Sequence, residues 1–260
     1  MRLEERVNAN RDLLTPTDMG IWKLIFNHRK AAGKMSVQEM ARAAVVSSAT
    51  LVRFAQKLGF RGFSELRAAI NFEEPLHVDY KSNIFDNLKN FYADTAENLI
   101  NRDYDRASKL IYNARHILAF PSGYVQSNVV QEMKRIFLED KVYIHEIIGC
   151  GELTNIIDSL TTEDLFICVS LSGESPIVKD FAQRLKLKGV PTISITRLSD
   201  NTLASLSTVN LYVSPARFQI SGDENDGVYF LTLIPFFMLV EIMYLKYRIY
   251  AEKQNNNVEN

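Results

Sequence analysis

Three short stretches within the first 70 residues repeat apolar positions at the spacing of a helix, and each follows a helix-start signal. Thr15-Pro16-Thr17-Asp18 offers a capping hydroxyl, a proline at the first helical position and an acid at the third. Ser36-Val37-Gln38-Glu39 is a capping box that opens a short helix to about Ala43, and Ser47-Ser48 opens a third helix that ends at Gly59. The predicted inward-facing residues are Ile21, Leu24, Ile25, Leu51, Phe54, Ala55 and Leu58. Two short helices about four residues apart are typical of a helix-turn-helix.

In a helix-turn-helix the last helix reads DNA, so the outer face of the third stretch carries the candidate contacts. Turning its apolar stripe inward places Ala49, Arg53 and Gln56 outward, with Ser48, Thr50 and Lys57 along the flanks. Hydroxyls can bond phosphate or a base edge, and an arginine can fork onto guanine. A plain amphipathic helix with a polar outer face has the same pattern. With the two cap residues, the candidate DNA contacts are Ser36, Ser47, Ser48, Ala49, Thr50, Arg53, Gln56 and Lys57.

Charge divides the chain at about the same place. Residues 1–70 hold 12 Lys and Arg against 6 Asp and Glu, whereas the rest hold 18 against 25, so a net charge of +6 is followed by one of −7. A basic segment joined to an acidic remainder favours contact of the first part with a polyanion, although an ordinary solvated surface would also fit.

Beyond a polar, proline-bearing stretch at 73–82, strands and helices alternate. Helices are predicted over about 82–102 and 105–114, and the predicted strands cover 116–120, 142–145, 165–170, 191–196 and 211–213. This alternation predicts a parallel sheet flanked by helices on both faces, with ligands beyond the carboxyl ends of the strands. We therefore expect two domains: an all-α helix-turn-helix domain at 1–72 and an α/β domain at 83–250, joined by a linker at 73–82 and followed by a polar tail at 251–260.

The loop after the third predicted strand is the best phosphate candidate. Ser170-Leu171-Ser172-Gly173-Glu174-Ser175 brings hydroxyls and backbone N–H groups to the start of a helix near Pro176. Serine and glycine also simply make turns and N-caps, so the motif alone leaves both interpretations open. After the first predicted strand stand Ser122 and Gly123, with Ser127 nearby.

The chain resembles the RpiR-type (MurR-type) bacterial transcription regulators. The resemblance rests on Val46-Ser47-Ser48-Ala49-Thr50-Leu51-Val52-Arg53-Phe54 and Lys57-Leu58-Gly59-Phe60-Arg61-Gly62-Phe63. In that family a helical DNA-binding domain precedes a SIS (sugar isomerase) domain that binds phosphosugars. The resemblance implies an SIS match over roughly 83–215, with Ser170, Ser172, Gly173 and Ser175 as ligand-binding positions.

The other SIS loop departs from the family pattern. The family has Gly-x-Gly-x-Ser after the first strand, whereas this chain has Pro121-Ser122-Gly123-Tyr124-Val125, with only Gly123 in register. Ile177 stands where an acid is often found. These changes remove a flexible turn and a hydroxyl from the expected pocket wall. The ligand-binding candidates are Ser122, Gly123, Ser170, Ser172, Gly173 and Ser175.

Enzymatic chemistry has little support in the sequence. Glu174 and His145 are possible proton-transfer bases by type, but no spacing pairs them, so we expect a sensor rather than a phosphosugar isomerase. An SIS domain that only dimerises remains the other alternative. Cys150 and Cys168 form no CxxC pair and have no nearby histidine, so no metal or cofactor is expected. The charged N-terminus lacks the apolar region of a secretory signal, and the location expected is the cytoplasm.

Residues 227–240 are uncharged and invite a membrane interpretation. Pro235 and Glu241 make the segment a poor membrane span, so we expect instead a buried helix from about Asp226 to Tyr250 that forms a dimer interface. The expected partners are therefore a double-stranded DNA operator, a phosphosugar effector and a second copy of the chain in a homodimer or higher homo-oligomer, with no membrane.

Overall fold

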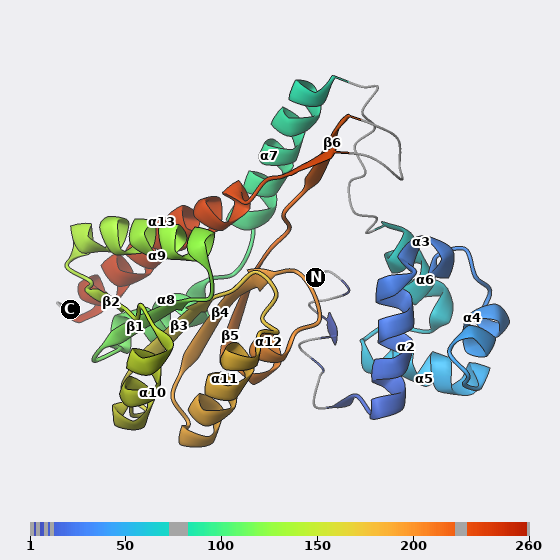
Figure 1. Cartoon of the computed structure of the whole chain (residues 1–260), viewed down its shortest axis with the longest axis horizontal. Coiled ribbons are helices and arrows are strands. Elements are labelled where there is room, and N and C mark those ends of the chain that lie inside the picture. The colour runs from blue at the N-terminus through green and yellow to red at the C-terminus, as the bar shows by residue number, and fades with distance from the viewer. Residues whose placement is uncertain are drawn as a thin grey trace. The chain divides into compact units, whose positions relative to one another are not determined.

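The computed structural model describes residues 3, 6–7, 10, 13–72, 83–221 and 228–258, which form two compact units, Met1–His77 and Val78–Asn260 (Figure 1). The predicted linker at 73–82 lies outside the described residues. The two units are described separately below.

The N-terminal unit is all-helical, as the sequence predicts. Within residues 13–72 its α-helices are α2 (Pro16–Asn27), α3 (Arg29–Ala32), α4 (Val37–Ala43), α5 (Ser48–Lys57) and α6 (Phe63–Phe72). Capping boxes are present at Thr15 and Ser36, and the Ser47 hydroxyl caps α5. Gly59 follows the end of α5 with φ +80°, a left-handed conformation that a glycine adopts without strain.

One hydrophobic core holds these helices together. The predicted inward residues of α5 are all fully buried, and Ile21 and Ile25 of α2 are buried with them. Trp22 and Met40 fill the space between the helices. Because most of the apolar surface faces this core, the polar face of α5 is left available to solvent.

The second unit is built on a five-stranded parallel sheet. Its strands are β1 (Ile117–Pro121), β2 (Ile144–Glu146), β3 (Leu165–Val169), β4 (Thr192–Arg197) and β5 (Val209–Val213), in the spatial order β2-β1-β3-β4-β5. The helices that lead into or connect them are α7 (Ile84–Ile100), α8 (Asp105–Asn113), α9 (Tyr124–Phe137), α10 (Cys150–Ser159), α11 (Pro176–Lys188) and α12 (Thr202–Leu206). The predicted parallel sheet is confirmed.

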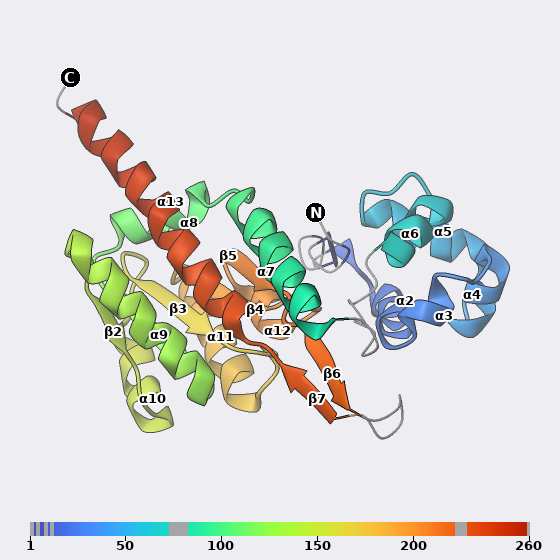
Figure 2. The same ribbon diagram turned by 90° about the horizontal axis from the view of Figure 1, so that it is seen from above.

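Both faces of the sheet are covered (Figures 1 and 2). Ala119 and Ile167 share a core with α8, α9 and α13 (Ile234–Val258), whereas Phe120 and Cys168 point to α10 and α11 on the other face. Alternate residues of a strand point to opposite faces, and here both faces are buried. This explains why the strands read as unbroken apolar runs.

The C-terminal part differs from the expectation at both ends. The predicted helix from 226 to 250 was wrong at its start, because Val228–Leu231 forms β7, which pairs antiparallel with β6 (Arg217–Ser221). Phe218 of β6 packs edge to face on Phe91 of α7, with ring centroids 5.7 Å apart. The β-branched and aromatic residues at 228–230 suit a strand once a partner is present.

Helix α13 also continues to Val258, so residues 251–258 of the predicted polar tail are helical. The Tyr112 hydroxyl donates to Asn255 Oδ1 at 3.0 Å, and Arg248 lies 3.7 Å from Glu252. The helix is not buried all round, since Glu241, Leu245 and Ile249 are exposed. Among the described helices, none combines the length and the apolarity that crossing a membrane requires.

Candidate functional site

The polar face of α5 has the exposure that the sequence predicts for a DNA-reading helix. Ala49, Arg53 and Gln56 are exposed, and Ser48 and Thr50 are half-buried. Thr50 also takes part in the cap, because its backbone N–H donates to Ser47 Oγ at 3.1 Å and the two hydroxyls lie 2.9 Å apart. The face is thus held rigid by its own cap.

The hydroxyls of the two cap residues make hydrogen bonds within the chain, in addition to any contact with DNA. Ser36 Oγ accepts from the backbone N–H of Glu39 at 3.3 Å, in an exposed capping box. The hydroxyls of Ser36 and Ser47 therefore fix the starts of α4 and α5.

Lys57 has a partner that the sequence did not predict. Its Nζ donates to Asp18 Oδ2 at 2.6 Å, joining α5 to the start of α2, and the Asp18 side chain is only 4% exposed. Burial raises the pKa of Asp18, but hydrogen bonds from Lys57 and Thr15 outweigh it and hold the pKa below its usual value. In the unit by itself the charge of Lys57 is thus matched by Asp18, unlike that of Arg53, whose Nε donates to Ala49 O at 3.4 Å.

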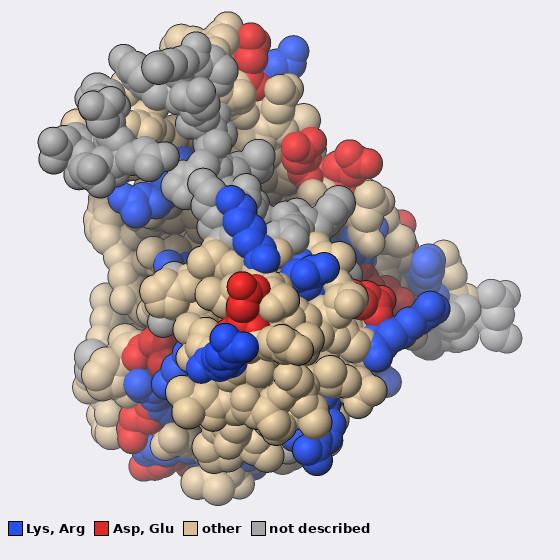
Figure 3. Space-filling model, turned by 90° about the vertical axis from the view of Figure 1, so that its right-hand side faces the viewer, with Lys and Arg blue, Asp and Glu red and all other residues tan. Residues whose placement is uncertain are grey.

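The other two acids within residues 13–72 also lie at helix starts. Residues 13–72 contain only Asp18, Glu39 and Glu65. The Glu39 carboxylate accepts from the Ser36 backbone N–H at 2.7 Å, and that of Glu65 accepts from the Arg61 backbone N–H at 2.6 Å. Exposed bases are Lys23, Lys34, Arg42, Arg53 and Arg61. Lys and Arg side chains, drawn blue in Figure 3, are spread over the face of the molecule seen there.

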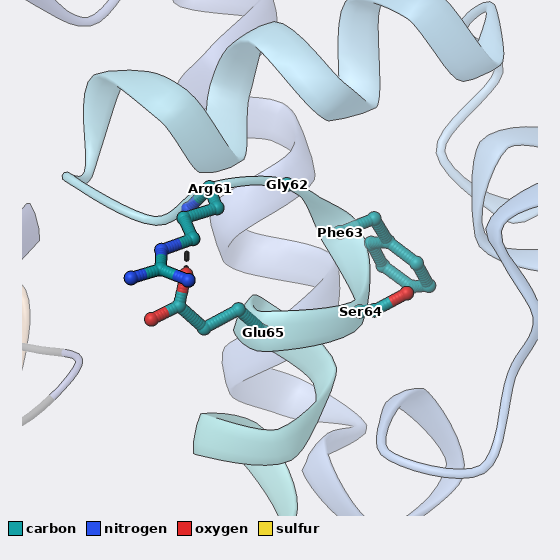
Figure 4. Close-up of a pocket in the computed structure, with 5 residues that line it drawn as sticks. All are labelled: Arg61, Gly62, Phe63, Ser64 and Glu65. Atoms are coloured by element: carbon teal, nitrogen blue, oxygen red, sulfur yellow. Dashed lines mark hydrogen bonds between the residues drawn. The ribbon is translucent and has the colours of Figure 1, made fainter.

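A surface hollow lies at the start of α6. It is lined by Arg61, Gly62, Phe63, Ser64 and Glu65. The Glu65 carboxylate accepts a hydrogen bond from the backbone N–H of Arg61 there (Figure 4). None of the predicted ligand-binding residues belongs to this hollow.

The turn between α4 and α5 contains an unusual residue. Val45 has φ +55°, and the chain closes around it as in a glycine-type helix end: Val45 N donates to Arg42 O at 3.1 Å, and Val46 N donates to Ala41 O at 2.9 Å. A left-handed conformation costs an L-residue about 1 to 2 kcal/mol, and a β-branched residue is among the least suited to it.

In the second unit the two predicted ligand loops meet. Pro121 of β1 lies opposite Val169 of β3, so the loops that follow leave the sheet at the same edge. The Ser122 hydroxyl donates to Ser170 Oγ at 2.9 Å, and the Gly173 backbone N–H donates to the same oxygen at 3.1 Å. Ser170 is almost fully buried and shapes the loop from within.

Ser172 and Ser175 have different surroundings. Ser172 Oγ accepts from the backbone N–H of Glu174 at 3.3 Å, at the surface. Ser175 is the residue at which α11 begins, and among the described residues its buried Oγ has no hydrogen-bond partner. A buried hydroxyl without a partner is costly, and at the N-terminus of a helix this one can donate to an anion.

A third loop, after β4, supports this site and was missed in the sequence. Asn201 is buried; its Nδ2 donates to Thr196 Oγ1 and Ser199 O, both at 3.1 Å, and its Oδ1 accepts from Ala204 N at 2.8 Å. Gly173, at φ +68°, packs directly on it: a Cβ there would lie 2.7 Å from Asn201 Cγ. An asparagine before a short helix is a cap signal that the sequence does contain.

The possible bases and Ser127 are engaged elsewhere. The Glu174 carboxylate accepts from the Thr202 backbone N–H and lies 3.5 Å from Lys179, whereas His145 on β2 lies 3.5 Å from Glu152. Ser127 Oγ donates to the buried Glu146 at 2.8 Å. The exposed Gly123 precedes α9, and a Cβ there would lie 2.7 Å from Gln126 Oε1.

Comparison with known proteins agrees with the two units. The model of the rpiR-family helix-turn-helix domain matches residues 1–74, and that of the SIS domain matches 110–223. The HTH-type transcriptional regulator GlvR of Bacillus subtilis is 32% identical over the whole of both chains, and the uncharacterized HTH-type transcriptional regulator YbbH of the same organism is 24% identical over 80% of this chain and 78% of its own. The structure of Vibrio vulnificus NanR complexed with ManNAc-6P has a TM-score of 0.54 and 18% identity, covering 99% of this chain and 98% of NanR. The chain belongs to the rpiR family of helix-turn-helix transcriptional regulators, with an SIS domain after the helix-turn-helix domain.

Proposed function

We propose that the chain regulates transcription by reading a duplex operator with α5 and by responding to a phosphorylated sugar bound between the loops that follow β1 and β3. For DNA, the support is electrostatic and geometric. Arg53 and Gln56 stand exposed on α5, and the three acids within residues 13–72 accept hydrogen bonds at helix starts. The N-terminal end of α5 then enters the major groove, and its residues there are Ser47, Ser48, Ala49 and Thr50.

The buried, unpartnered hydroxyl of Ser175 carries the proposal for the effector. It lies at the start of α11, where the helix dipole and free N–H groups favour an anion. A phosphate oxygen supplies the acceptor that this hydroxyl lacks, and Ser172 and the loop backbone add further donors. The ManNAc-6P held by NanR is a sugar phosphate, which supports the same class of ligand here.

The loop after β1 offers little to select one sugar ring over another. Pro121 is part of β1, and the hydroxyl of Ser122 is directed at Ser170. Tyr124 and Val125 follow in α9, so this wall offers fewer hydroxyls than the Gly-x-Gly-x-Ser pattern of the family. The phosphate therefore supplies most of the recognition, and the sugar ring contributes less.

We further propose that the SIS domain senses its ligand without turning it over. Glu174 and His145 each have another partner, and they stand on the loop after β3 and on the edge strand β2. Proton nuclear magnetic resonance of sugar phosphates incubated with the purified chain tests this. Conversion of any of them to its aldose or ketose isomer would contradict the proposal.

The operative form proposed is a homodimer, with a reader at 1–72 and the SIS domain from 83 onward, because paired readers engage two half-sites of an operator. The exposed Leu245 and Ile249 of α13 offer an apolar surface for it. Leu245→Glu places a charge on this exposed surface, whereas a charge at the partly buried Phe237 would also disturb the core of the chain itself. Light scattering should show a dimer for the wild type and a shift toward monomer for the variant.

Calorimetry tests the effector site. Titration with a panel of sugar phosphates and their unphosphorylated parents should give binding for at least one phosphate and for none of the parents. Ser175→Ala should weaken that binding roughly 10- to 100-fold, because one charge-assisted hydrogen bond is lost. It should leave folding intact, since Ser175 makes no side-chain cap. Ser159→Ala, at the end of α10, is the matched control. Absence of binding across the panel would refute the proposal.

A further inference from the structure

Val45, in the turn of the helix-turn-helix, adopts a conformation for which valine is poorly suited. Its φ of +55° lies in the left-handed region, between α4 and α5. Among the described residues the other left-handed positions are Gly59, Gly173, Gly189 and Lys141, so Val45 is the only β-branched residue in this conformation. A strained residue persists where some other interaction outweighs its strain.

Packing against the described residues does not supply that interaction. The side chain of Val45 is 90% exposed, so its isopropyl group is not packed in the core. The two backbone hydrogen bonds that close the turn are ones that glycine or asparagine would make equally well. Packing within the described residues therefore does not explain a valine at this position, whereas a partner outside the chain would.

The position of the turn identifies the kind of partner. Val45 is two residues before Ser47, the cap of α5, and four before the exposed Ala49. Resting on the proposed function, in which α5 reads DNA, we propose that Val45 is a further specificity residue that makes an apolar contact with a thymine methyl group in the major groove. The C5-methyl of thymine is the apolar group that base edges present there.

The test uses a duplex selected by the full-length wild type from a random-sequence pool. Val45→Gly and Val45→Asn both relieve the left-handed strain and remove the isopropyl group. Each should raise the melting temperature of the N-terminal unit by about 2 to 6 °C and weaken binding to the selected duplex about tenfold, as expected for two lost methyl contacts. Binding to an unrelated duplex should not change.

Replacing thymines one at a time by deoxyuridine locates the contact, since this removes only the methyl group. At one thymine, this replacement should weaken binding by the wild type about tenfold. The same replacement should not weaken binding by the two variants any further, because they already lack the isopropyl group. Leu187→Asn removes an equally exposed apolar side chain from α11 and is the control for general surface effects.

Each remaining outcome is decisive. Variants that bind as tightly as the wild type, variants that melt at a lower temperature, or losses that no thymine shares would each overturn the proposal. Failure of the wild type to select any duplex would instead overturn DNA reading itself, so the two failures are distinguishable.

Discussion

In the N-terminal unit the candidate contacts are close in the sequence, whereas in the SIS unit they come from separate loops. Ser47 to Gln56 lie on one helix with its own cap. Ser122 and Ser170 are 48 residues apart, and Asn201, which supports Gly173, belongs to a third loop. DNA contact by the reader should therefore depend on single exposed side chains of one helix, while ligand binding by the sensor depends on how its loops pack together.

The largest effect is expected where two loops touch. Gly173→Ala should weaken sugar-phosphate binding by more than about 100-fold and destabilise the SIS unit by about 2 to 4 kcal/mol. The left-handed backbone at this position is strained for alanine, and the new Cβ collides with Asn201. Calorimetric titration and thermal unfolding measure both. Gly151→Ala has open space around it and should be close to neutral. Equal effects of the two substitutions would show that the loop contact is unimportant.

Arg53 should contribute to DNA binding and not to the stability of the fold. Arg53→Ala should weaken binding to the selected duplex by about 1 to 3 kcal/mol, because an exposed base-reading side chain is lost. Its melting temperature should barely change. Gel-shift titration at fixed salt decides, and an unchanged affinity would remove Arg53 from the interface.

Lys57, on the same helix, should behave in the opposite way. Lys57→Met keeps the aliphatic stem and leaves the Asp18 carboxylate buried without its cation, so the N-terminal unit should lose about 1 to 2 kcal/mol of stability. Denaturant unfolding gives this value. A variant as stable as the wild type but with weaker DNA binding would make Lys57 a DNA contact instead.

Acid should act on the same pair. The pKa of Asp18 is lowered by folding, so its contribution to stability is present above about pH 4 and is lost as the pH falls below that value. Urea unfolding followed from pH 6 to pH 3 should show this loss in the wild type. In Lys57→Met the pH dependence should be smaller, and an identical slope in both proteins would contradict the assignment.

The smallest effect concerns the helical C-terminus. Tyr112→Phe removes the hydrogen bond to Asn255 and should cost about 0.5 to 1 kcal/mol, near the exposed end of α13. Amide hydrogen exchange should show faster exchange at 251–258. If neither the stability nor the amide exchange changes, residues 251–258 are a frayed tail, as their composition predicts.

The helices and strands that sequence patterns predicted are those whose signals are local. The caps at Thr15, Ser36 and Ser47 and the apolar runs of the five parallel strands fall within a few residues of the observed elements. The antiparallel pair of β6 and β7 was missed because residues 228–231 are apolar in a pattern that suits a helix or a strand, and only pairing with β6 decides between them.

The candidate site residues also differ in whether local sequence patterns could place them. Exposure along α5 follows from helix geometry, so Arg53 and Gln56 could be placed from spacing. The pairing of Lys57 with Asp18, 39 residues away, and the packing of Gly173 on Asn201 depend on tertiary contacts that no local pattern contains. A family resemblance could point to the loop at 170–175, but not to the unpartnered hydroxyl of Ser175 within it.

The most direct test of the account joins the two units in one experiment. Affinity for the selected duplex is measured by fluorescence anisotropy as the best-binding sugar phosphate is added. The wild type should change its affinity by roughly 5- to 150-fold, the range of ordinary allosteric coupling, while the unphosphorylated sugar has no effect. Ser175→Ala should need roughly 10 to 100 times more ligand for the same change. A DNA affinity that no sugar phosphate alters would contradict the claim that the SIS domain senses a phosphosugar for the reader.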